Sequence, residues 1–148
     1  MNPDAVAICR DRFGVTEFPA EGPTLDRAAL LDIAAALKAS GFDYFVYCAA
    51  MHQAAAGDLP DRTVVEYRIR RLPGDDFWFR VTVPTGEGTP SLARLWRGAD
   101  WQEREQHDLV GTRFDGHPDL RRIMLPEDWE GYPLRRDYAI DTRHHPWR

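Results

Sequence analysis

Hydrophobic and polar positions alternate along two neighbouring stretches of this chain. In Thr63 to Arg70, positions 65, 67 and 69 are apolar and positions 66, 68 and 70 are charged; in Phe77 to Val83, positions 77, 79, 81 and 83 are apolar and would face inward. Strict alternation is typical of a strand that buries one face. Between the stretches, Pro73 and Gly74 suit the two central positions of a type II turn. The pattern therefore predicts an antiparallel hairpin.

A continuous apolar run, Tyr44 to Ala50, precedes this hairpin. Such a run is typical of a strand covered on both faces, so we expect a central strand here. The following segment, 53–62, contains Ala, Gly and Pro residues and is expected to be a loop.

Two helices are expected near the N-terminus. Pro3 suits a first helical turn and Gly14 a C-terminal cap, which predicts a helix over 4–13. A second helix is predicted between a capping Thr24 and Gly41, since its apolar residues fall on one face: Leu30, Ile33, Ala34 and Leu37.

Capping signals mark two further helices later in the chain. Ser91 is expected to cap a short helix through Trp96. Asp100 is expected to cap the next helix, with Glu103 completing a capping box and Gly111 ending it. With 148 residues, the chain is expected to form an α+β fold of helices packed on a mostly antiparallel sheet.

Charge and composition narrow the classes of partner. The net charge of −5 argues against a general nucleic-acid binder. No signal peptide is apparent and no apolar run approaches the ~20 residues of a membrane span, so membrane contact is expected only through a partner. Cys9 and Cys48 are expected to be buried free thiols, with a disulfide as the alternative.

The last 36 residues differ from the rest in composition. Seven Arg and seven Asp or Glu give residues 113–148 no net charge, whereas residues 1–112 hold twelve basic and seventeen acidic residues, a net −5. Repeated prolines exclude a long helix or strand, although Pro118 after His117 suits a short helix entry. Aromatic and Arg residues laced through an irregular segment are typical of interfaces. We therefore divide the chain into a domain, 1–112, and an extended, irregular C-terminal docking arm, 113–148; the alternative is a segment that wraps around its own core.

Charged residues cluster on the helix predicted after Asp100. Trp101, Glu105 and Asp108 would share one face, with Arg104 four residues before Asp108. Paired carboxylates at this spacing suit acid–base catalysis, but we favour the alternative that they form a structural ion-pair cluster. Five histidines show no zinc spacing, and no phosphate-binding glycine loop is present, so we expect neither a metal nor a nucleotide site: His52, His107, His117, His144 and His145.

Three segments of fixed spacing carry a family resemblance: Trp101 to Gly111, Phe114 to Met124, and Pro126 to Tyr138. They closely resemble the 30 kDa subunit family of NADH:quinone oxidoreductase, which is respiratory complex I. The motif residues of that family fall on Glu103, Arg104, Glu105, Asp108, His117 and Arg121, and its closing element on Pro133 to Tyr138, including Arg135, Arg136 and Tyr138. The chain departs from the family pattern at Met51-His52, at Val110 and at Thr112.

The resemblance implies a non-catalytic subunit in the peripheral arm of a proton-translocating complex, with no cofactor or metal of its own. FMN, iron–sulfur clusters and quinone would lie on other subunits, at the cytoplasmic side of the bacterial inner membrane. The expected partners are the quinone-pocket subunit and the iron–sulfur subunits, contacted through the motif residues. The chain would support the quinone-pocket subunit and the assembly of the complex.

The motif residues are expected to have two roles. Glu103, Arg104, Glu105 and Asp108 would fix the junction between domain and arm, while Arg121, Arg135 and Arg136 would pair with partner carboxylates. Two alternatives remain: the equivalent scaffold subunit of a ferredoxin-, coenzyme F420- or hydrogenase-linked relative, and a free-standing acid–base enzyme.

Overall fold

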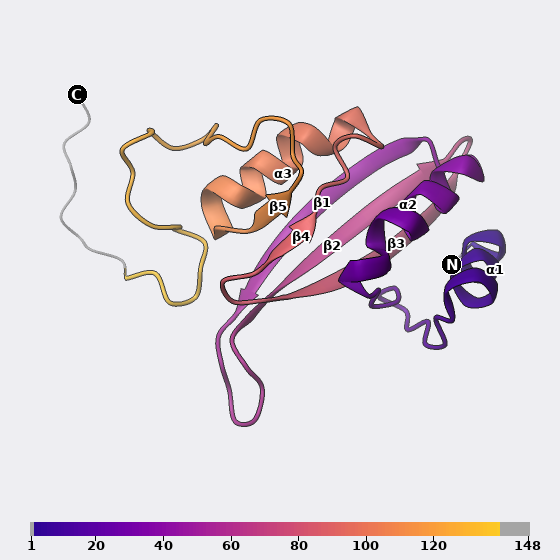
Figure 1. The fold of residues 1–148 in the computed structure, drawn as a ribbon, viewed down its shortest axis with the longest axis horizontal. Helices are drawn as coiled ribbons and strands as arrows, with labels where there is room; N and C mark the ends of the chain where they lie inside the picture. Colours follow the sequence, from indigo (N-terminus) through magenta and orange to yellow (C-terminus); the bar gives the residue numbers. More distant parts are fainter. Residues whose placement is uncertain (1, 140–148) are drawn as a thin grey trace.

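The computed structural model describes residues 2–139. Along the chain the elements are α1 (Pro3–Phe13), the 3-10 turn η1 (Arg27–Ala29), α2 (Leu30–Ala39), β1 (Tyr44–Gln53), β2 (Arg62–Arg71), β3 (Asp75–Pro84), β4 (Gly88–Pro90), α3 (Arg97–Val110) and β5 (Arg113–Asp115). Strands β1 to β3 form one antiparallel sheet, and β4 pairs with β5 in parallel. The expected α+β fold of helices on a mostly antiparallel sheet is confirmed (Figure 1).

The strand order corrects one expectation. The hairpin of β2 and β3 is confirmed, but β2 is the central strand and β1 lies at the edge. Helix α3 covers the free edge of β1: the Oε1 atoms of Gln102 and Gln106 accept the N–H groups of Cys48 (2.7 Å) and Ala50 (2.9 Å). These glutamines supply hydrogen bonds that a further strand would otherwise supply. The run of apolar residues in β1 is therefore explained by helix α3, which covers this edge strand.

The hairpin turn also differs from the expected type. Arg71 pairs with Asp75, so three residues connect the strands, and the N–H of Gly74 donates to the carbonyl of Arg71 (3.1 Å). Pro73 is therefore the third residue of the turn, after a cis peptide bond, and not the second residue of a type II turn.

The first helices follow the sequence pattern, with one change of cap. Helix α1 ends at Gly14 as expected, and the side chain of Asn2 caps its start. Asp26, rather than Thr24, caps the turn η1 that leads into α2. Thr24 instead lies beside Arg80 of β3, where the neighbouring backbone forms two hydrogen bonds with that residue.

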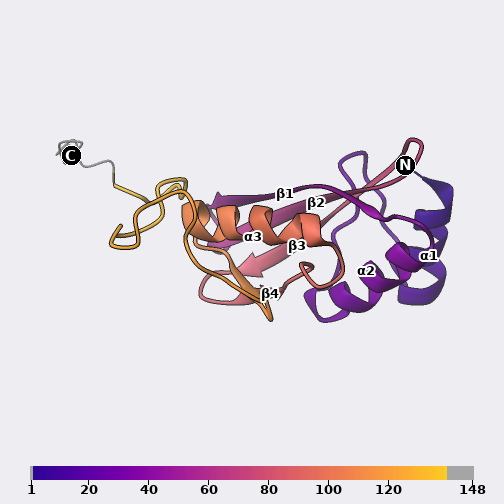
Figure 2. The same ribbon diagram turned by 90° about the horizontal axis from the view of Figure 1, so that it is seen from above.

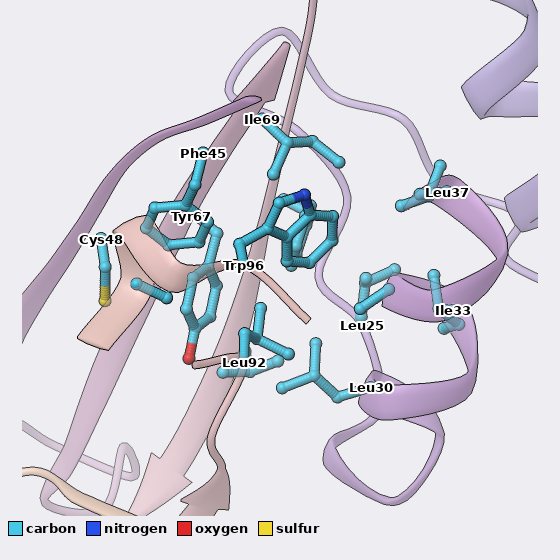
Figure 3. Close-up of a cluster of buried hydrophobic side chains, with 14 of the residues drawn as sticks. Leu25, Leu30, Ile33, Leu37, Phe45, Cys48, Tyr67, Ile69, Leu92 and Trp96 are labelled. Carbon is cyan, nitrogen blue, oxygen red and sulfur yellow. The ribbon is translucent and has the colours of Figure 1, made fainter. Parts of the chain in front are cut away.

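One apolar core joins the sheet to the helices (Figure 3). Leu30, Ile33 and Leu37 of α2 point toward the sheet, and Trp96 lies between α2 and the strands. The alternating residues of β2 and β3 are fully buried on the same face, as expected. Each large apolar side chain buried in this way contributes about 1.5–3 kcal/mol. Cys9 and Cys48 lie in this core as buried free thiols, as expected.

The connection into α3 differs from the expected helices. Residues 91–96 form a single turn closed on the carbonyl of Leu92, not a helix. Helix α3 begins at Arg97 after an N-cap, Trp96, that makes no side-chain cap bond, so Asp100 lies inside its first turn. The expected capping box is wrong, because the carboxylate of Glu103 points into the protein and accepts other donors.

The C-terminal arm leaves the domain at β5. Residues 116–139 contain no helix or strand, so the helix expected after Pro118 is wrong. Figures 1 and 2 show this segment passing along α3 and lying at the end of the molecule opposite α1 and α2. Phe114 of β5 is buried in the core, which ties the start of the arm to the domain. The division at 112/113 stays a prediction.

Candidate docking site

Asp108, near the C-terminal end of α3, holds the backbone of the arm. Its side chain is fully buried, and its Oδ2 accepts the N–H groups of Ile123 (2.9 Å), Met124 (2.7 Å) and Leu125 (3.0 Å). Its Oδ1 accepts a guanidinium N–H of Arg122 at 2.6 Å. Burial alone would raise the pKa of this carboxyl, but these donors outweigh burial and hold the pKa at about 2. Asp108 is therefore a charged structural anchor.

Arg122 extends this anchor along the arm. Its Nη2 donates to the carbonyl oxygens of Trp129 (3.1 Å) and Gly131 (3.0 Å), while Nη1 also donates to the carbonyl of Asp108 (2.9 Å). Its guanidinium lies 5.2 Å from the ring centroid of Tyr132. One side chain thus closes the loop 122–131 on itself and on α3. The family motif pointed to the neighbouring Arg121, and adjacent arginines carry no signal that distinguishes the two.

The arm also meets the end of α3 through backbone contacts. The N–H of Leu134 donates to the carbonyl of Leu109 at 2.9 Å. Gly111 ends α3 at φ +81°, and a Cβ at this position would lie 2.6 Å from the ring of Tyr132. Only glycine gives both the left-handed conformation and the close approach of this ring.

His52, at the end of β1, is a second anchor. Its side chain is 1% exposed, and its Nδ1 accepts the backbone N–H of Arg136 at 3.0 Å. Because Nδ1 accepts, Nε2 carries the proton and donates to Asp61 Oδ1 at 2.6 Å. Sequence reasoning considered His52 only as a metal ligand and as a departure from the family pattern. Its partner lies 84 positions away, a separation that no local pattern reveals.

An ion-pair cluster surrounds His52. Arg135 donates to both carboxylate oxygens of Asp137 (2.8 and 2.7 Å) and lies 3.7 Å from Asp61. His52, Asp61 and Asp137 place metal-type donor atoms within 4.8 Å of one another. However, the guanidinium of Arg135 already sits against all three side chains, and both ring nitrogens of His52 are engaged. The cluster therefore suits a protein cation rather than a metal ion.

Glu103 is buried in the domain and does not reach the arm surface. Its carboxylate accepts the Ser91 hydroxyl (2.5 Å) and the N–H of Leu92 (2.7 Å), and its side chain is fully buried. Burial raises the pKa of Glu103 to about 7, against the opposing effect of these two donors. Its contacts fix the 91–96 turn to α3. Within the domain this acid is a packing element.

His117 fixes the point where the arm starts. Its side chain is fully buried, its Nδ1 accepts the N–H of Asp119 (3.0 Å), and its Nε2 donates to the carbonyl of Asp100 (3.1 Å). Nε2 also lies 4.0 Å from the carboxylate of Glu103. The ring thus joins the first turn of α3 to the first residues of the arm.

Arg104 contacts the arm and not Asp108. Its Nε donates to the carbonyl of Arg121 (3.2 Å), and its Nη1 lies 3.6 Å from Asp119. No ion pair joins Arg104 to Asp108 in residues 2–139, so the expected i, i+4 pair is wrong. Trp101, Glu105 and Asp108 do share one face of α3, as expected, but that face is unevenly covered: Asp108 is fully buried while Trp101 is 68% exposed.

The other predicted contact residues lie nearer the surface. Glu105 and Tyr138 are half-buried, and Arg136 is exposed. Arg121 is also exposed and donates to both carboxylate oxygens of Asp119 (2.6 and 2.8 Å). A groove of about 710 Å³ lies between residues 50–56 and the arm residues Leu134 and Arg136. His144 and His145 lie outside the described residues.

Comparisons with known proteins agree with this architecture. The profile of the family described as respiratory-chain NADH dehydrogenase, 30 Kd subunit, matches residues 23–144. The chain is 40% identical to the NAD(P)H-quinone oxidoreductase subunit J of Synechococcus sp. (strain CC9605) over 131 residues, 78% of this chain and 67% of that protein. It is 55% identical over 60 residues to an NADH-quinone oxidoreductase subunit of Chlorobium phaeobacteroides, covering 40% of this chain and 36% of that protein. A solved structure, Nqo5 of the trypsin-resistant fragment (1-134), superposes with a TM-score of 0.68 at 30% identity, covering 81% of this chain and 100% of that one.

Proposed function

This chain belongs to the 30 kDa subunit family of respiratory-chain NADH dehydrogenase, and on that premise we propose that it is a non-catalytic subunit that supports the quinone-pocket subunit and the assembly of the complex. The family match makes it a subunit of an NADH:quinone oxidoreductase, with other subunits of that complex as its partners. Proton translocation, the quinone-pocket role and the cytoplasmic face of the membrane belong to the proposal. Among residues 2–139, no helix combines the length and hydropathy that a membrane crossing requires.

One observation carries the proposal: both buried acids of the motif are occupied by structural hydrogen bonds, Asp108 with the arm and Glu103 with the 91–96 turn of the domain. Asp108 accepts four donors from the arm, and Glu103 accepts two donors from the domain. Buried carboxylates whose oxygens already accept hydrogen bonds from the chain suit a structural role better than proton transfer to a substrate. FMN, iron–sulfur clusters and quinone would accordingly lie on other subunits.

The proposal gives the motif residues two roles. Arg104, Asp108 and His117 fix the junction of domain and arm, as their contacts support, while Glu103 fixes the 91–96 turn to α3 within the domain. Glu105, Arg121, Arg136 and Tyr138 would contact the partner, and Arg135 would shape the arm through Asp137. The neighbours would be the quinone-pocket and iron–sulfur subunits.

The experiment is affinity purification of the tagged chain from gently solubilised membranes, with every co-purifying chain identified by mass spectrometry. We expect recovery with quinone-pocket and iron–sulfur subunits. Recovery of the chain alone, from the soluble fraction, would contradict the proposal. It would favour the alternative of a free-standing enzyme with Glu103 and Asp108 as catalytic acids.

The same purification addresses a second candidate. The relatives differ in name between NAD(P)H- and NADH-quinone oxidoreductase, so the electron donor follows from the complex and not from this subunit. A co-purifying flavin chain that binds NADH would identify NADH as donor. A ferredoxin-, coenzyme F420- or hydrogenase-type chain in its place would identify the scaffold role in a related complex.

Matched variants test the contact role of the arm. Replacing Arg135 and Arg136 together by Ala is expected to reduce incorporation into the complex, because an ion pair and an exposed cation are lost. Replacing Arg10 and Arg12 on α1 by Ala makes the same charge change at the opposite end of the molecule. If the two variants are incorporated equally, Arg135 and Arg136 do not contribute to the interface.

A further inference from the structure

We propose that the loop 126–131 of the arm, called the tip below, docks Trp129 and its flanking carboxylates onto a basic surface with an apolar centre on a neighbouring subunit. The inference rests on the proposed function and deepens it. It differs from the expected contacts of the arm, in which arginines meet partner carboxylates.

Most arginines in the described part of the arm, residues 113–139, are already engaged within the chain. Arg122 donates to Asp108, Arg121 to both oxygens of Asp119, and Arg135 to both oxygens of Asp137. A guanidinium held bidentately by its own chain must break that pair to meet another carboxylate. These three cations therefore contribute little new attraction for an acidic partner.

The carboxylates of the tip are in the opposite situation. The tip contains Glu127, Asp128 and Glu130 and no basic residue. All three are exposed, and no hydrogen bond or ion pair joins them to another residue within 2–139. Docking against an apolar or acidic surface would strip these charges of water without compensation. A basic rim on the partner satisfies them, so charge complementarity selects the sign of the partner surface.

An exposed aromatic side chain stands in the middle of these charges. Trp129 is 39% exposed, and Met124 and Leu134 on the same arm are each 62% exposed. Tryptophan at the centre of an interface, ringed by polar groups, is the residue type that most often carries binding energy. An apolar pocket on the partner is the surface that Trp129 fits.

The tip is also held in shape before it meets a partner. The N–H of Trp129 donates to the carbonyl of Pro126 (3.1 Å), and Arg122 donates to the carbonyls of Trp129 and Gly131. A preformed tip loses less conformational entropy on docking than a loop that folds on binding. A second copy of this chain is a poor occupant, since its net charge is −5.

The first test is zero-length carbodiimide cross-linking of the purified complex, which joins carboxylates to lysine amines. This chain has a single lysine, Lys38, so a cross-link from the tip to another lysine identifies a partner directly. We expect peptides 126–131 joined to a lysine of a neighbouring subunit. A tip joined to Lys38 of a second copy would overturn the inference.

The second test also detects a partner rim made of arginine. The variant E127Q/D128N/E130Q is co-expressed with differently tagged wild type, and the share of each in the complex is measured. We expect about a tenfold lower share for the variant, with the difference shrinking at high salt, because salt screens exposed ion pairs. The control D11N/E17Q/D32N removes three exposed acids near α1 and α2 and should compete as well as wild type.

Trp129→Ala separates the apolar contribution from the charges. We expect this variant also to lose incorporation, without the salt dependence of the triple variant. Equal incorporation of the triple variant and its control would overturn the inference while leaving the proposed function intact. Failure of wild type itself to co-purify with other subunits would instead overturn the proposed function.

Discussion

The domain and the C-terminal arm are held in place by different physical means. In the domain, apolar side chains of α1, α2 and three strands pack into one buried core. Beyond β5, hydrogen bonds to two buried side chains, Asp108 and His52, hold the described part of the arm on the domain. Apolar burial is non-directional and shared among many contacts, whereas a hydrogen-bonded anchor is local and directional. The arm is therefore expected to fail at single residues that leave the domain folded.

The largest expected effect belongs to the core. Phe79→Ala removes a fully buried ring that stacks on Tyr67 at 5.3 Å between centroids. We expect a loss of about 3–5 kcal/mol in the free energy of unfolding, measured by urea denaturation. Trp129→Ala in the arm should lower the same quantity by less than about 1 kcal/mol, because its side chain is partly exposed. Similar losses in both variants would contradict the division into core and arm.

Asp108→Ala is the matching change in the arm. It leaves the guanidinium of Arg122 and three backbone N–H groups without their buried acceptor, which costs about 3–5 kcal/mol. The rate of limited trypsin digestion measures how firmly the arm is held, because trypsin can cleave the arm after four arginines: Arg121, Arg122, Arg135 and Arg136. We expect rapid cleavage there while the core stays resistant. Asp108→Asn keeps one acceptor oxygen and should be intermediate; resistance like that of wild type would refute the anchor.

Glu103 is expected to make the free energy of unfolding of the domain depend on pH. Its folded pKa of about 7 lies above its ordinary value of 4.5, so the folded state binds the proton more tightly than the unfolded state. The resulting stability is fully present below pH 4.5 and is lost as the pH rises through 7, by about 3 kcal/mol. Gln cannot ionise, so unfolding free energies of wild type and Glu103→Gln should diverge across this window. Glu105→Gln, a control on the half-buried neighbour, should follow wild type; parallel curves for Glu103→Gln would contradict the assignment.

His52→Ala is expected to have a smaller effect than Asp108→Ala. The change removes the acceptor of the Arg136 N–H and the donor to Asp61, a loss of about 1–3 kcal/mol in the local stability of the arm. Amide exchange at residue 136 should accelerate while residues 123–125, held by Asp108, keep their protection. Acceleration of both regions together would show that the arm is one cooperative unit.

The same contrast explains what the sequence could predict. Periodicity located α2, β2 and β3 and the buried faces of β2 and β3, because burial of one face leaves a repeating pattern, and the terminal residues Pro3 and Gly14 located α1. The position of β1 at the edge was not predictable, since the glutamines that cover it lie more than fifty residues away. The family motif identified Asp108 and His117, but neither the motif nor helical spacing revealed their partners. Arg122, Asp61 and His52 were missed because their pairings depend on how an irregular segment folds back.

The central claim is that the described part of the arm is folded on the domain before any partner binds. The most direct test is hydrogen–deuterium exchange of the isolated full chain, followed at the amides of residues 123, 124, 125 and 136. The contacts with Asp108 and His52 predict that these amides exchange far more slowly than an unstructured chain, though faster than the central strand β2. Exchange at the unstructured rate, with β2 still protected, would show that the arm folds only on its partner and would contradict the account.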